Sequence, residues 1–197
     1  SDVNYGTVFI GSGTVTANNA MDNGNDVGGS SVFTGNTYTN WGGIGVAPSG
    51  YLSLTGLNYC IFMNNEYNDN VSYNSITSAS GTAALITMGG IFKNYSGGST
   101  VQPTGTIYAT YNNNTVTITN APSAGTSAII GMTSQGLSPS LITASITMNN
   151  NIITNCAVTG AAASAASFSG ITNTSICGVL NINNNIIRGL NTTATSG

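Results

Sequence analysis

The chain has 197 residues, of which only 4 % are charged and none is histidine, and its formal net charge is −3. Five acidic and two basic side chains offer no basic face to a nucleic acid and no polybasic patch to anionic lipid. No apolar run approaches the roughly 20 residues that a membrane-spanning helix needs, although 40 % of the residues are hydrophobic, unlike a typical disordered chain.

Secondary structure is expected to be almost entirely β. Strong helix formers are scarce, since the sequence contains a single Glu, a single Lys and a single Arg. β-Branched residues and turn formers are frequent, which favours many short strands. Residues 1–31 are the least regular part and predict irregular strands or a partial coil, with candidate strands at 7–10 and 14–17.

Two short acidic segments are candidates for calcium binding. Asp22, Asn25 and Asp26 alternate carboxylates and amides around a glycine, as part of a calcium loop does. The full EF-hand spacing and its terminal Glu are absent, so an Asx-rich turn is the competing interpretation. Glu66 and Asp69 form a second, similar pair.

From residue 32 onward a short phrase returns, with alternating apolar residues, then Asn, then a β-branched residue. Alternation is typical of a strand with one buried face, and Asn tolerates the left-handed conformation of a tight corner. The last Asn of each copy recurs at uneven intervals in the range of about 20–50 residues that predicts stacked units. These corner positions are Asn36, Asn74, Asn114, Asn151 and Asn185.

Each corner reads as strand, turn, strand, and a further apolar strand follows at 83–88, 127–132 and 166–171. Three short strands per unit predict a parallel β-helix (β-solenoid) of about five coils of 34–40 residues over residues 32–197, with a loop excursion at 93–103. Stacked coils would bring successive Asn side chains to about 4.8 Å, close enough for a ladder of amide hydrogen bonds.

Aromatic residues gather in the first clear coil, where Trp41, Tyr51 and Tyr59 are candidates for a carbohydrate-binding platform. Aromatic filling of an irregular coil is the simpler alternative. The discriminating feature is whether these rings lie exposed on one face.

Three cysteines, Cys60, Cys156 and Cys177, are an odd and widely spaced set that argues against a disulfide framework. They are expected to serve as small buried hydrophobic residues. A bridge between Cys156 and Cys177 stays open as an alternative.

Catalysis is not expected, and neither is a cofactor. All five acids lie at or before Asp69, so the rest of the sequence has no carboxylate side chain for acid–base catalysis. The sequence also has no histidine, which is the usual base beside a Ser or Cys nucleophile and a usual ligand of zinc. An ice-binding array of Thr-x-Thr is disfavoured as well, because Thr115, Thr117 and Thr119 would be followed in the next coil by Ile152, Thr154 and Cys156.

The repeated Asn-Asn-Asn-Ile-Ile phrase resembles right-handed parallel β-helix repeat proteins, and more narrowly the large secreted repeat proteins of Bacteroidota. The resemblance covers about residues 32–190. It implies export to the cell surface, often by the type IX route, and adhesion or surface-layer roles. The expected function is therefore a non-catalytic stalk or body of an extracellular or cell-surface adhesin, and the alternative is a carbohydrate-binding module.

On this interpretation the expected partners are adjacent coils of a longer chain, a surface glycan, or another cell-surface or secretion-machinery protein. The sequence ends at Gly197 without a capping unit, and an open solenoid end exposes strand edges. We therefore expect the chain to be a segment of a larger protein.

Overall fold

The computed structural model describes residues 6–10, 24–31, 34–41, 57–64, 66, 68–78, 87–94, 108–121, 127–135, 144–160 and 166–193. These residues form three parallel sheets. Sheet I consists of β1 (Thr7–Ile10), β4 (Leu57–Asn64), β7 (Thr87–Asn94), β11 (Ala128–Gln135) and β14 (Ser167–Asn173). Sheet II consists of β3 (Thr37–Trp41), β6 (Ser75–Ser78), β9 (Thr115–Thr117), β10 (Thr119–Asn120), β13 (Ile152–Thr159) and β16 (Ile186–Thr193). Sheet III consists of β2 (Asp26–Gly28), β5 (Asp69–Ser72), β8 (Tyr108–Thr110), β12 (Ser145–Thr147) and β15 (Val179–Asn181).

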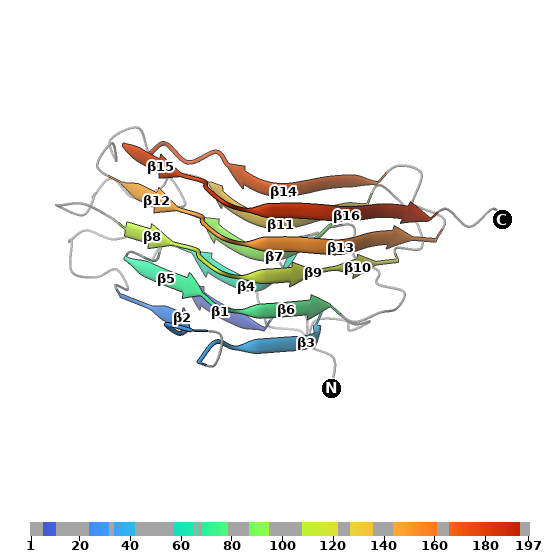
Figure 1. Ribbon diagram of the computed structural model, residues 1–197, viewed down its shortest axis with the longest axis horizontal. Coiled ribbons are helices and arrows are strands. Elements are labelled where there is room, and N and C mark those ends of the chain that lie inside the picture. The colour runs from blue at the N-terminus through green and yellow to red at the C-terminus, as the bar shows by residue number, and fades with distance from the viewer. Residues whose placement is uncertain are drawn as a thin grey trace.

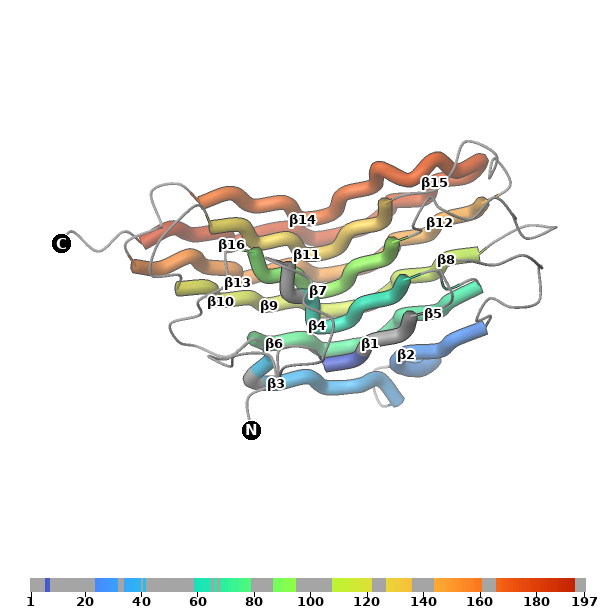
Figure 2. The backbone as a smooth tube through the Cα atoms, turned by 180° about the vertical axis from the view of Figure 1, so that it is seen from behind, coloured from blue at the N-terminus to red at the C-terminus, as the bar shows by residue number. Residues whose placement is uncertain are grey.

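The chain visits the three sheets in a fixed rotation. A strand of sheet III is followed by a strand of sheet II and then by one of sheet I, and we call one such passage a repeat. Figure 1 shows the repeats stacked from β2 and β3 at one end to β15 and β16 at the other. Figure 2 views the molecule from behind, with sheet I toward the reader. The prediction of an all-β chain with parallel strands is confirmed, no described residue is helical, and the arrangement is compatible with a β-solenoid.

Left-handed residues form the corners between sheets III and II. Asn113, Asn150 and Asn184, the middle residues of the three Asn runs, have φ values of 58°, 57° and 55°. Asn accepts this conformation more readily than most residues because its short side chain bonds locally. Tyr73 occupies the same position before Asn74 and has φ 61°, which is unusual for a bulky residue.

The space between the sheets is filled by one apolar core. Alternation decides which side chains enter it, as in β9, where Val116 is buried between the half-buried Thr115 and Thr117. The core residues of the three sheets are Val27, Trp41, Cys60, Ile61, Met63, Val71, Ile76, Met88, Ile91, Ala109, Tyr111, Val116, Ile118, Ile129, Met132, Ala144, Ile146, Met148, Ile153, Cys156 and Val158.

Glycines in sheet I let side chains of sheet II approach its backbone. A Cβ atom at Gly131 would lie 2.4 Å from Cδ1 of Ile153 and 2.4 Å from the carbonyl oxygen of Gly170, both far inside normal contact. Gly90 meets Val116 in the same way, and Gly170 meets Ile187. A side chain at these positions would push the two sheets apart.

Two sequence-based expectations need correction or extension. Residues 93 and 94 do not begin a loop, because β7 continues through Lys93 to Asn94 and buries Lys93 completely. The sheets also extend into residues 1–31, since β1 pairs with β4 and β2 pairs with β5.

Candidate functional site

An asparagine ladder is the most extensive polar feature of the described residues. The side-chain amide of Asn36 donates to Oδ1 of Asn74 at 3.2 Å, and Asn74 donates to Asn114 at 3.0 Å. Asn114 donates to Asn151 at 3.1 Å, and Asn151 donates to Asn185 at 3.0 Å. The structure therefore joins all five predicted corner residues through four side-chain links.

The ladder has a direction. Backbone N–H groups of Asn74, Asn114 and Asn151 also donate to Oδ1 of the next Asn, at 3.0, 2.9 and 2.8 Å. The side-chain amides of Asn74, Asn114 and Asn151 each make a further bond to a carbonyl oxygen of the preceding repeat, as Asn114 does to Val71 at 2.8 Å. Asn74, Asn114 and Asn151 are buried, so these bonds satisfy polar groups that water does not reach.

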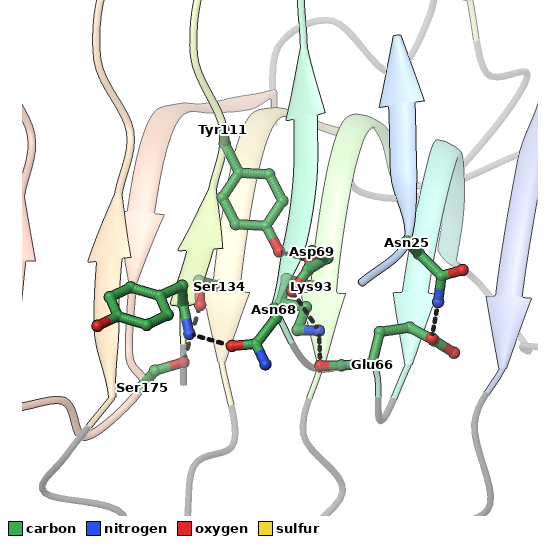
Figure 3. Close-up of polar contacts among 9 residues, drawn as sticks. Asn25, Glu66, Asn68, Asp69, Lys93, Tyr111, Ser134 and Ser175 are labelled. Carbon is green, nitrogen blue, oxygen red and sulfur yellow. Dashed lines mark hydrogen bonds and ion pairs between the residues drawn. The ribbon is translucent and has the colours of Figure 1, made fainter. Parts of the chain in front are cut away.

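A second polar cluster lies inside the first repeats and contains most of the described charge (Figure 3). Nζ of Lys93 lies 3.1 Å from Oδ1 of Asp69 and also donates to the carbonyl oxygen of Glu66. Tyr111 donates its hydroxyl to the other carboxylate oxygen of Asp69 at 2.5 Å. Lys93, Asp69 and Glu66 are all buried.

The electrostatics of this cluster are those of a closed ion pair. Burial lowers the pKa of Lys93, because a charged ammonium loses its hydration, and the neighbouring Asp69 carboxylate opposes that effect. Both side chains are 0 % exposed, so the pair does not face an outside substrate. Sequence reasoning missed the pair, although Lys93 stands two residues after the inward-facing Ile91, which is the period that places it inside.

The calcium candidates are engaged with protein partners where the structure describes them. Asn25 donates its amide to Oε2 of Glu66 at 2.5 Å, and Asp26 accepts the amide of Asn70 at 2.8 Å. Asp22 lies outside the described residues. Within the described ranges no group of three or more His, Cys, Asp or Glu side chains could hold a metal ion.

The aromatic candidates do not form an exposed platform. Trp41 is 1 % exposed and belongs to the core, and Tyr59 is 2 % exposed and packs on Phe92 with ring centroids 4.5 Å apart. Burial raises the pKa of Tyr59 to about 12. These two rings are closed to a sugar, which corrects the carbohydrate hypothesis for them, and Tyr51 lies outside the described residues.

The cysteines are free thiols. Cys60 and Cys156 are buried and Cys177 is half-buried, so the alternative of a bridge between Cys156 and Cys177 is wrong. Burial raises the pKa of all three thiols, most strongly at Cys60, which makes them weak nucleophiles.

Hydroxyl side chains align on the outer face of sheet II, but the row is interrupted. Thr37 pairs with Ser75 and Ser75 with Thr115, whereas the next two positions in register are Ile152 and Ile186. The expectation that Ile152 breaks the array agrees with this register.

The last repeat presents an apolar surface to solvent. Seven large hydrophobic residues between 176 and 190 are exposed by 37–50 %. They extend over β15 and β16 and the segments before each strand, at the C-terminal end of the stack in Figure 1. We call this surface the C-terminal face, and its members are Ile176, Val179, Leu180, Ile182, Ile186, Ile187 and Leu190.

Comparison with known proteins gave no match: no family model, no curated protein and no solved structure is significantly similar to the chain. Among the described residues no helix has the length and hydrophobicity required to cross a lipid bilayer. Function therefore has to be argued from the asparagine ladder, the buried ion pair and the C-terminal face.

Proposed function

We propose that the chain is a non-catalytic structural segment, the stalk or body of a large secreted cell-surface protein, built as a parallel β-helix. The asparagine ladder is the observation that carries this proposal. Its links join residues 34 to 40 positions apart and run through every repeat from Asn36 to Asn185. Polar side chains are thus used to fasten one repeat to the next.

The buried ion pair supports the same function. Lys93, Asp69 and Tyr111 come from two successive repeats and bond to one another in the interior, where they hold the repeats in one register. An enzyme would be expected to direct such groups toward a substrate. Here they contribute to the specificity of packing.

Composition also favours a role as a spacer outside the cell. Stacked repeats add about 4.8 Å each, so that length grows with the number of repeats. A surface with few charges and many hydroxyl and amide groups suits an extended body that makes few specific contacts. Export by the type IX route and membership of an adhesin follow from the resemblance alone, and we include them in the proposal on that basis.

Intact-mass measurement and peptide mapping of the native protein test the proposal. We expect a mass several-fold above the 19.8 kDa of this chain, with further Asn-corner repeats, and recovery of the protein from the surface of intact cells by mild protease treatment. A native mass equal to the 19.8 kDa of the chain, or a location inside the cell, would refute the proposal.

A further inference from the structure

Three side chains of the C-terminal face stand at positions that belong to the core in the earlier repeat. In the strand register, Leu180 is aligned with Ile146, Ile187 with Ile153, and Leu190 with Cys156. The three residues of the earlier repeat are at most 1 % exposed, whereas their counterparts are exposed by 44 %, 46 % and 37 %. The difference arises because β12 and β13 are covered by a following strand, while no described strand follows β15 and β16.

The asparagine ladder ends at this face with Asn185, whose hydrogen-bond donors are directed toward the next repeat position. Asn185 accepts two hydrogen bonds from Asn151, one from the backbone and one from the side chain. Its own amide donates to the carbonyl oxygen of Met148 at 2.7 Å. Asn74, Asn114 and Asn151 each donate a backbone N–H and a second amide hydrogen to the next Asn, and within the described chain no Asn follows to accept them from Asn185.

The opposite end of the stack differs. Tyr38 of β3 packs against the core and bonds through its hydroxyl to Oγ1 of Thr7 in β1 at 2.7 Å, so that it bridges two sheets. Trp41 and Val27 are buried there, and the side chains described at this end include no large exposed hydrophobic residue before Tyr108. Among the side chains whose exposure the structure describes, the apolar surface therefore lies at the C-terminal end, which favours a following repeat over a second copy stacked head to tail.

The geometry points to the C-terminal face as the docking surface for one further repeat of the same protein, which adds parallel strands to β14, β15 and β16. Its corner Asn accepts hydrogen bonds from both the backbone N–H and the side-chain amide of Asn185. Its apolar side chains cover Leu180, Ile187 and Leu190. This inference rests on the proposed structural function and specifies where and how the stack continues.

Amide hydrogen exchange compares the native protein with an isolated chain of residues 1–197. In the native protein we expect the N–H of Asn185 to exchange as slowly as that of Asn151, because both then bond to a following Asn. In the isolated chain we expect the N–H of Asn185 to exchange at least tenfold faster than that of Asn151. Equal and fast exchange of Asn185 in both proteins would overturn the inference.

A matched pair of substitutions provides a second test. Leu180→Ser is expected to lower the melting temperature of the native protein about as much as Ile146→Ser does, but to lower that of the isolated chain much less. Similar small effects of Leu180→Ser in both proteins would show that nothing covers the face.

Two outcomes separate the inference from the proposed function. A native protein of large mass at the cell surface with an unprotected Asn185 would leave the structural function in place and overturn the docking inference. Protection of Asn185 in the isolated chain that rises with concentration, and is lost on Leu190→Lys substitution, would assign the face to a second copy and also overturn it.

Discussion

Replacement of the central ladder residue, Asn114→Ala, should destabilise the protein far more than replacement of the terminal one, Asn36→Ala. Asn114 is fully buried, and its Oδ1 accepts the backbone N–H and the side-chain amide of Asn74, each at 3.0 Å. Its amide donates to the carbonyl oxygen of Val71 at 2.8 Å and to Asn151 at 3.1 Å.

The magnitude follows from the groups that lose their partners. Alanine at position 114 leaves the N–H of Asn74 without its acceptor and the carbonyl of Val71 without this donor, at about 1–3 kcal/mol for each buried group. We therefore expect a loss of about 2–6 kcal/mol, which is a large part of a total stability of about 5–15 kcal/mol. Asn36 is exposed and makes one ladder bond of 3.2 Å, so its replacement should cost only about 0.5–1.5 kcal/mol.

Urea denaturation followed by circular dichroism measures both variants against the unsubstituted chain, and thermal unfolding checks the order. For a protein of this size the central substitution should lower the melting temperature by about 10 °C. Equal losses of stability for Asn114→Ala and Asn36→Ala would refute the argument that the ladder bonds fasten the repeats together.

Three further predictions use the same denaturation assay. Lys93→Met should lower the free energy of unfolding by about 3–5 kcal/mol, because it leaves the buried Asp69 without its counter-charge. Addition of Asp69→Asn should recover most of that loss. Additive losses in the double variant would contradict the ion-pair argument. Tyr59 has a folded pKa of about 12, above the ordinary 10.0, because its buried site favours the neutral phenol. Its contribution to the free energy of unfolding is therefore fully present below pH 10.0 and is lost as the pH rises to about 12. The loss should be about 3 kcal/mol and absent from Tyr59→Phe, and parallel pH curves for the two proteins would count against it. Tyr73→Asn should stabilise the chain by about 1 kcal/mol, because Asn adopts φ 61° at lower cost, and a loss of stability would show that the packing of the tyrosine matters more.

Local sequence information was sufficient for the corners. The Asn runs predict a left-handed residue between two strands, and Asn150 with φ 57° is such a residue. Alternation before each run identifies the inward positions, as at Ile146 and Met148, both buried. These features depend on neighbours within a few residues, which is why sequence periodicity recovers them.

The buried ion pair could not be predicted in the same way. A lysine in a nearly uncharged chain is expected at the surface, and its burial depends on Asp69, which lies 24 residues earlier in another sheet. Burial of Trp41 likewise depends on how the first repeat closes against its neighbours. Contacts between distant segments decide both positions. Alternation from Ile91 places Lys93 on the inner face, but no local pattern identifies Asp69 as its partner.

The uneven spacing of the corners has a physical explanation in the register of the strands. Intervals of 34 to 40 residues separate the Asn corners, yet β7, β11 and β14 remain aligned residue by residue across sheet I. Additional residues are therefore accommodated in the connections between strands, where a longer loop costs little extra entropy. A shift by one residue within a strand would instead turn its core side chains outward and break a ladder bond. Each repeat is thus constrained at its strands and its corner Asn, and the connections are where changes in length are tolerated.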